Sequence, residues 1–65
     1  MINKDIGAKL RALRGERSQA EVAEDLGVSV SALSMYECGN RIPRDEIKIR
    51  IANYYGKSVS EIFFA

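Results

Sequence analysis

Side chains that usually carry catalysis are scarce in this sequence. Histidine is absent, and Cys38 is the one cysteine among 65 residues. A zinc site built from Cys and His ligands is therefore excluded, and the chain offers neither a glycine-rich phosphate loop nor a nucleophile spaced beside a base. We expect no enzyme, no cofactor and no metal site, and we expect Cys38 to be a small, partly buried residue.

Charged side chains offer a different chemistry, because they are segregated along the chain although the net charge is only +1. Residues 1–17 hold five Lys or Arg against two acidic residues, residues 18–27 hold three acidic residues and no basic one, and residues 41–50 hold four basic against two acidic. Such segregation can give one face a positive potential that attracts a polyanion. The alternative is a solvated helix surface without a partner, and charge alone does not separate the two.

Five segments with apolar residues at helical spacing must position these groups. They span about residues 3–14, 18–26, 29–38, 44–55 and 58–63. A serine suited to an N-cap begins three of them, and a glycine that can adopt a left-handed conformation closes four of them. These residues are Ser18, Ser29 and Ser58, and Gly15, Gly27, Gly39 and Gly56. No segment alternates with a period of two, so we predict an all-α, compact five-helix fold in which residues 1–65 form a single domain.

The second and third predicted helices have the spacing of two helices joined by a tight turn. Ala23 lies four residues after Gln19, Gly27 follows four residues later, and Leu33 and Tyr36 complete the pattern. A small side chain at Ala23 lets the helices approach each other, and Gly27 can adopt the positive φ that ends the first of them. Leu33 and Tyr36 would then pack the next helix against it.

The stretch SQAEVAEDLGVSVSALSMYECGNRIP, residues 18–43, resembles the Xre-like, phage-repressor type of helix-turn-helix proteins. The segment IANYYGKSVSEIFF is similar to their fourth and fifth helices, so the resemblance extends from Ile6 to Phe63. It implies a transcription regulator, expected to be a repressor, that binds an inverted-repeat operator in double-stranded DNA as a homodimer. One departure is the link GERS between the first two helices, which looks about two residues shorter than usual and should only trim a surface turn.

The free face of the third predicted helix is the surface that the family lays into the major groove. A helical projection puts Ala32, Leu33 and Tyr36 on the core side. By resemblance, the base-facing residues on the other side are Val30, Ser31, Ser34 and Met35. This face lacks Arg, Lys, Asn and Gln, which usually read guanine and adenine, whereas its apolar residues could contact thymine methyl groups. The alternative is that Val30 and Met35 lie under a neighbouring protein chain.

Backbone contacts to DNA are also implied by the resemblance. Gln19 begins the second helix, where free N–H groups and the helix dipole favour a phosphate. A second phosphate clamp would surround the turn after the third helix, with the residues Asn40, Arg41 and Arg44. Cys38 stands where the family often has a basic or amide residue. Arg14 and Glu37 match a structural ion pair of the family.

The fourth predicted helix carries apolar side chains around more than half of its circumference, wider than one core-facing stripe needs. They are Ile47, Ile49, Ile51, Ala52, Tyr54 and Tyr55. Ala52 and Tyr55 fit core positions of the family, which leaves a strip with no obvious cover. We therefore predict a two-fold dimer interface formed by Ile47, Ile51, Tyr54 and Phe64. The alternative is that these residues pack the core and the tail frays.

A second class of function stays open beside the DNA-binding regulator. The sparsely polar third helix and the apolar fourth helix also suit an antitoxin-like or adaptor module that uses the same fold to bind a partner protein. The N-terminus lacks the apolar run of a secretory signal, and no apolar stretch is long enough to span a membrane. With a single free thiol, the chain suits a reducing cytoplasm, where we expect it to act.

Overall fold

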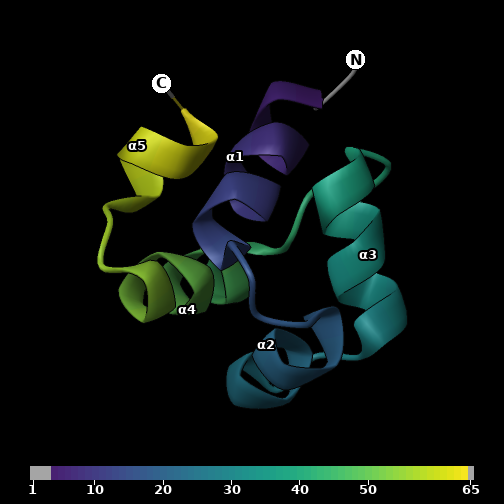
Figure 1. The fold of residues 1–65 in the computed structure, drawn as a ribbon. Coiled ribbons are helices and arrows are strands. Elements are labelled where there is room, and N and C mark those ends of the chain that lie inside the picture. The colour runs from purple at the N-terminus through teal and green to yellow at the C-terminus, as the bar shows by residue number, and fades with distance from the viewer. Residues whose placement is uncertain (1–3, 65) are drawn as a thin grey trace.

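A computed structural model describes residues 4–64, which form five α-helices and no strand (Figure 1). The helices are α1 (Lys4–Arg14), α2 (Gln19–Leu26), α3 (Val30–Cys38), α4 (Asp45–Tyr55) and α5 (Val59–Phe63). The prediction of an all-α, five-helix fold is confirmed. Residue 3, where the first helix was predicted to begin, lies outside the described residues.

Local capping sets the helix boundaries. The hydroxyls of Ser18, Ser29 and Ser58 each accept a hydrogen bond, 3.0 Å long, from the backbone N–H three residues further along. At α5 the Glu61 carboxylate in turn accepts a hydrogen bond from the Ser58 N–H at 2.8 Å, which completes the predicted capping box. This bond lowers the pKa of the Glu61 carboxyl below its ordinary value. All four predicted closing glycines have positive φ.

The turn between α2 and α3 depends on Gly27, whose φ of 75° ends α2. Helix α3 begins only three residues after Gly27, and the two helices meet at a steep angle (Figure 1). Arg50 of α4 donates from Nη1 to the Leu26 carbonyl oxygen at 2.8 Å. A cation at this position satisfies an orphan carbonyl and opposes the negative end of the α2 dipole. The tight turn is thereby tied to a third helix.

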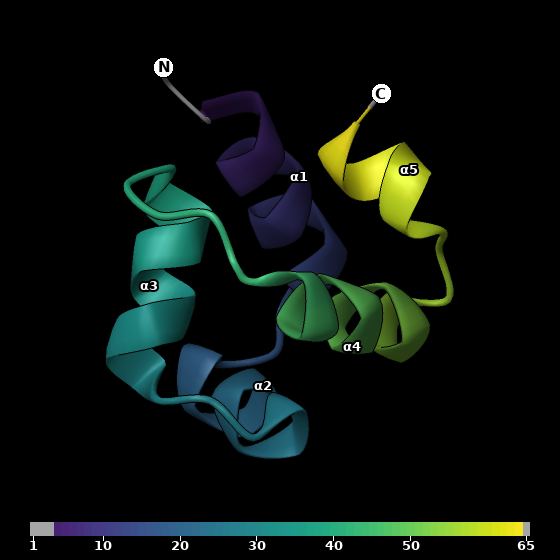
Figure 2. The ribbon, with the colours of Figure 1, turned by 180° about the vertical axis from the view of Figure 1, so that it is seen from behind.

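One hydrophobic core joins the five helices. Helix α1 runs through the middle, between α3 on one side and α5 on the other, while α2 and α4 close the far end (Figures 1 and 2). Every helix contributes buried apolar side chains: Leu10, Val22, Ala23, Leu26, Leu33, Tyr36, Ile47, Ile51, Ala52, Ile62 and Phe63. Leu33 and Tyr36, predicted on the core side of the third helix, are confirmed as buried, whereas Ala32 is only partly buried against the core. No helix in the described range is long and apolar enough to cross a membrane.

The apolar strip predicted to lie uncovered on the fourth helix is largely inside the core. Ile47 is 7% exposed and Ile51 is fully buried, so neither offers surface to a second copy and their assignment to a dimer interface is wrong. The stripe is wide because α4 packs against both α2 and α5, and each neighbour covers a different part of it. Ile49, at 54%, and Phe64, at 68%, are the large apolar residues of this region that remain exposed.

Candidate nucleic-acid interface

Helix α3 has one buried and one exposed face. Leu33 and Tyr36 point into the core. On the opposite side Val30 is 45% and Met35 37% exposed, Ser31 is exposed and Ser34 is half-buried. Cys38 is exposed rather than partly buried as expected, because it follows Ser34 by one helical turn and shares its outward direction. The four predicted base-facing residues therefore lie on one continuous outer surface.

Glu37 joins three helices beneath this surface. Its side chain is 1% exposed, and each carboxylate oxygen has a partner. Arg14 Nε, at the end of α1, lies 2.8 Å from Oε2, and Gln19 Nε2, at the start of α2, donates to Oε1 at 2.9 Å. The hydrogen bond to Glu37 raises the pKa of the Arg14 guanidinium. The carboxylate thus fixes the end of α1 and the start of α2 against α3.

The end of α3 is also held by two residues of α1 that the sequence analysis did not identify. Arg11 donates from Nη1 to the Glu37 carbonyl oxygen. Gly7 is buried, and a Cβ placed there would overlap the same carbonyl group, 2.9 Å from its carbon atom. The available signal was a lone glycine inside an amphipathic helix, which usually has a packing reason. Together these contacts keep α3 from sliding along α1.

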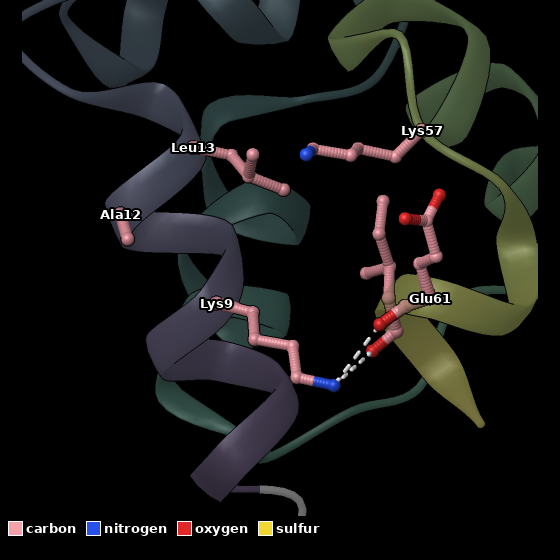
Figure 3. Close-up of a pocket in the computed structure, with 6 residues that line it drawn as sticks. Lys9, Ala12, Leu13, Lys57 and Glu61 are labelled. Atoms are coloured by element: carbon pink, nitrogen blue, oxygen red, sulfur yellow. Dashed lines mark hydrogen bonds between the residues drawn. The ribbon is translucent and has the colours of Figure 1, made fainter. Parts of the chain in front are cut away.

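Two cations of the basic cluster in the first seventeen residues, Lys9 and Arg17, bind backbone carbonyls at helix ends. Lys9 donates to the carbonyl oxygens of Glu61 and Ile62 at 3.1 and 3.3 Å (Figure 3), and Arg17 donates to those of Leu13 and Arg14. Cations at these positions complement the C-terminal ends of α5 and α1. Lys9 and Arg17 therefore act as C-terminal helix caps.

Figure 3 also shows a pocket of about 310 Å³ between α1 and α5. Its lining includes the apolar Ala12 and Leu13, and the side chains of Lys57 and Glu61 reach into it. Helix α3 lies on the other side of α1 (Figures 1 and 2). None of the predicted site residues lines this pocket, and the pocket is separate from the outer face of α3.

The residues predicted to bind phosphates lie at the start of α2, next to Glu37, and in the segment that follows α3. Gln19 is half-buried, and its amide is oriented by Glu37. Asn40, Arg41 and Arg44 are exposed in the segment between α3 and α4, and no side-chain bond ties them to residues 4–64. Buried Pro43 anchors this segment to the core. The exposed cations nearest in sequence to α3 are thus held on a short, anchored loop.

Tyr54, predicted at a dimer interface, already has partners within the chain. Its hydroxyl donates to Asp25 Oδ2 at 2.7 Å and accepts from Arg17 Nη1 at 3.2 Å. The guanidinium of Arg17 also lies 5.2 Å from the centre of the Tyr54 ring. The bond to Asp25 raises the pKa of Tyr54. This half-buried side chain connects α4 to α2 and to the link that precedes α2.

Phe64 borders a shallow apolar groove on the surface of α4 and α5. The groove has a volume of about 420 Å³, and its other lining residues are Asp45, Lys48, Ile49 and Val59. Lys48 Nζ lies 4.9 Å from the centre of the Phe64 ring, which partly covers the aromatic face with a cation. Exposed apolar surface of this kind marks a contact site more often than scattered single residues do.

Comparison with known proteins shows which family the chain belongs to. Residues 8–62 match the family described as helix-turn-helix. The cryptic phage CTXphi transcriptional repressor RstR of Vibrio cholerae is 37% identical over 57 residues, which cover 85% of this chain and 51% of RstR. The chain therefore spans about half the length of that curated relative.

Solved structures of gene regulators share the fold. The clp gene regulator ClgR of C. glutamicum has a TM-score of 0.81 at 28% identity, covering 95% of this chain and 82% of its own. The DNA-binding domain of the P22 c2 repressor has a TM-score of 0.82 at 25% identity, covering 95% of this chain and 84% of its own. The restriction-modification controller protein C.AhdI of Aeromonas hydrophila has a TM-score of 0.81 at 26% identity, covering 92% of this chain and 94% of its own.

These structures confirm the phage-repressor-like fold, and the relatives named here are regulators of genes rather than enzymes. The match of residues 8–62 covers more than half of the sequence. The chain belongs to the helix-turn-helix family of DNA-binding regulators, as its resemblance to the Xre-like proteins implies.

Proposed function

We propose that the protein is a sequence-specific transcription regulator that lays the outer face of α3 into the major groove of double-stranded DNA. The observation that carries this proposal is the contrast between the two faces of α3. One face is anchored to α1 and α2 through Leu33, Tyr36 and Glu37, while the other is exposed and offers Ser31 and its neighbours to a ligand. A rigidly held helix with a free face suits groove binding.

Phosphate contacts would position α3 without reading sequence. Gln19 keeps one amide hydrogen after its bond to Glu37, and it stands at the positive end of the α2 dipole. Arg41 and Arg44, with Asn40, would contact the backbone on the other side of α3. Their exposure supports this assignment, because their charges are available to a polyanion.

The size of the molecule supports a homodimer on an inverted-repeat operator. The largest extent of the described residues is 26 Å between Cα positions, whereas half-sites one DNA turn apart are separated by roughly 34–36 Å. A single copy would therefore cover one half-site. We assign the two-fold contact to Phe64 together with Ile49, since both are exposed along the groove of α4 and α5.

Repression is the regulatory sign supported by RstR, which is itself a transcriptional repressor. All five helices share one core, which supports treating residues 1–65 as one DNA-binding domain. Regulation of genes by binding to their operators would take place in the cytoplasm of a bacterial cell.

A protein-binding module is the second candidate. The exposure of Val30 and Met35 favours it, because apolar side chains on a surface helix are typical of contacts between proteins. An antitoxin-like or adaptor protein of this kind would bury the outer face of α3 against its partner. The exposed arginines that follow α3 would then have no role in binding this partner.

Titration of a fluorescent duplex at several salt concentrations tests the proposal. Wild-type binding should weaken as salt rises, because bound Lys and Arg displace condensed counterions. Arg41→Ala and Arg44→Ala should each weaken binding to all duplexes alike and reduce the salt slope by about one. Lys57→Ala is the matched control, since Lys57 lies beside the pocket between α1 and α5. Equal salt slopes for all three variants, or no binding of DNA by the wild type, would refute the proposal.

A further inference from the structure

The outer face of α3 has an apolar rim and a polar centre. With 3.6 residues per turn, Val30 and Met35 lie about 140° apart at the two edges of this face, and Ser31, Ser34 and Cys38 lie between them. Val30 and Met35 are two of the five large apolar side chains that are exposed in the described residues. Val30 is 45% and Met35 37% exposed, so each keeps part of its surface available to a ligand.

The major groove presents one apolar group for such side chains to contact. The C5-methyl group of thymine is the apolar feature of the base edges, whereas the other groups are hydrogen-bond donors and acceptors. The C5 atom lies on the side of the pyrimidine ring nearer its own backbone. An apolar rim around a polar centre therefore matches methyl groups at the borders of the groove. Methylation at C5 gives cytosine the same group in the same place.

We propose that Val30 and Met35 make this protein a reader of C5-methyl groups, so that thymine and 5-methylcytosine are bound alike and unmethylated cytosine is discriminated against. The inference rests on the proposed function, since it requires α3 in the major groove. The two residues are five positions apart, which is a rise of about 7.5 Å along the helix. Each half-site should therefore contain two separate methyl-dependent positions, one for each side chain.

Substituted duplexes test the role of the methyl group directly. A duplex is first selected by the wild-type protein from a random library. Each thymine of its half-sites is then replaced in turn by deoxyuridine, which lacks only the methyl group. At the two positions that face Val30 and Met35 we expect the Kd to rise about fourfold, as for the burial of one methyl-sized apolar group. Where C·G replaces T·A at these positions, 5-methylcytosine should bind about fourfold more tightly than cytosine.

Protein variants assign each methyl contact to a side chain. Val30→Ala should abolish the difference between thymine and deoxyuridine at one position, and Met35→Ala should abolish it at the other. Ser31→Ala is the matched control on the same face, and it should lower the affinity while preserving the fourfold difference at both positions. Thermal melts of the variants establish that each one is folded before its binding is compared.

The outcomes separate the inference from the proposed function. Specific binding with equal Kd values for thymine and deoxyuridine at every position overturns methyl reading and leaves the regulator assignment standing. A methyl effect that survives in both Val30→Ala and Met35→Ala also overturns it. Absence of any preferred duplex refutes the regulator itself. Val30→Ala and Met35→Ala variants that both bind every substituted duplex as the wild type does overturn it as well.

Discussion

At the scale of single residues, the burial of Glu37 requires that each of its oxygens be bonded, because an unpaired buried carboxylate is strongly destabilising. Arg14 and Gln19 meet this requirement at 2.8 and 2.9 Å. The two partners differ in exposure, since the Arg14 side chain is 20% exposed and that of Glu37 is 1% exposed. Removing the arginine therefore leaves a buried charge, whereas removing the glutamate leaves a cation that can reach water.

This asymmetry leads to a stability prediction. Arg14→Met should lower the free energy of unfolding by about 3–5 kcal/mol, the cost of removing one partner of a buried pair. Glu37→Gln should cost less. Arg41→Met is the control, because exposed Arg41 has no such partner and its loss should change stability by less than about 0.5 kcal/mol. Denaturant titrations measure all three, and a change below about 1 kcal/mol for Arg14→Met would contradict the account.

At the scale of the helices, α1 is tied to α3 by close backbone contact at Gly7. Replacing an exposed helical glycine by alanine normally adds about 1 kcal/mol of stability. At Gly7 the new Cβ would meet the backbone of Glu37, and such overpacking costs about 1–3 kcal/mol. The steric cost should prevail because a backbone atom cannot rotate away as a side chain can.

Gly7→Ala should therefore destabilise the protein by up to about 2 kcal/mol, the difference between these two effects. Ala12→Gly, at an exposed position of the same helix, gives the propensity contribution alone and should cost about 1 kcal/mol. Thermal unfolding followed by circular dichroism measures both. A melting temperature of Gly7→Ala above that of the wild type would show that α1 and α3 are not in close contact here.

How far the sequence predicts each helix depends on whether the determining contact is local. The N-caps at Ser18 and Ser29 involve residues three apart, so their positions could be predicted. The burial of Ile51 could not, because it depends on how α2 and α5 pack around α4. The same holds for Lys9, whose partners lie more than fifty residues away in α5. The site residues of α3 were located by family resemblance, and their exposure follows from helix periodicity.

At the scale of the whole molecule, the proposed dimer brings the exposed groove beside Phe64 against the same groove of a second copy. A charged side chain there would be brought next to its own copy across a two-fold axis and would oppose association. Phe64→Glu and Ile49→Glu should therefore shift the proposed dimer toward monomer at micromolar concentration. Their binding to an inverted repeat should weaken at least about tenfold, which corresponds to about 1.4 kcal/mol of lost dimer contact.

Sedimentation velocity measures the oligomeric state, with Ile42→Glu as the control. Ile42 is an exposed isoleucine like Ile49 but does not line the groove, so this variant should remain dimeric. A wild type that is monomeric at micromolar concentration, or a Phe64→Glu variant that still binds the inverted repeat as tightly as the wild type, would rule out the proposed interface.

The measurement that tests the central claim most directly is selection of bound sites from random duplexes, performed in parallel with the wild type and a Ser31→Ala/Met35→Ala variant. If the outer face of α3 reads the bases, the wild type should select an inverted repeat. The variant should lose or change its preference at particular base pairs, by about 1–3 kcal/mol for each specific contact. Selection of the same sequence with the same preference by both proteins would contradict the account.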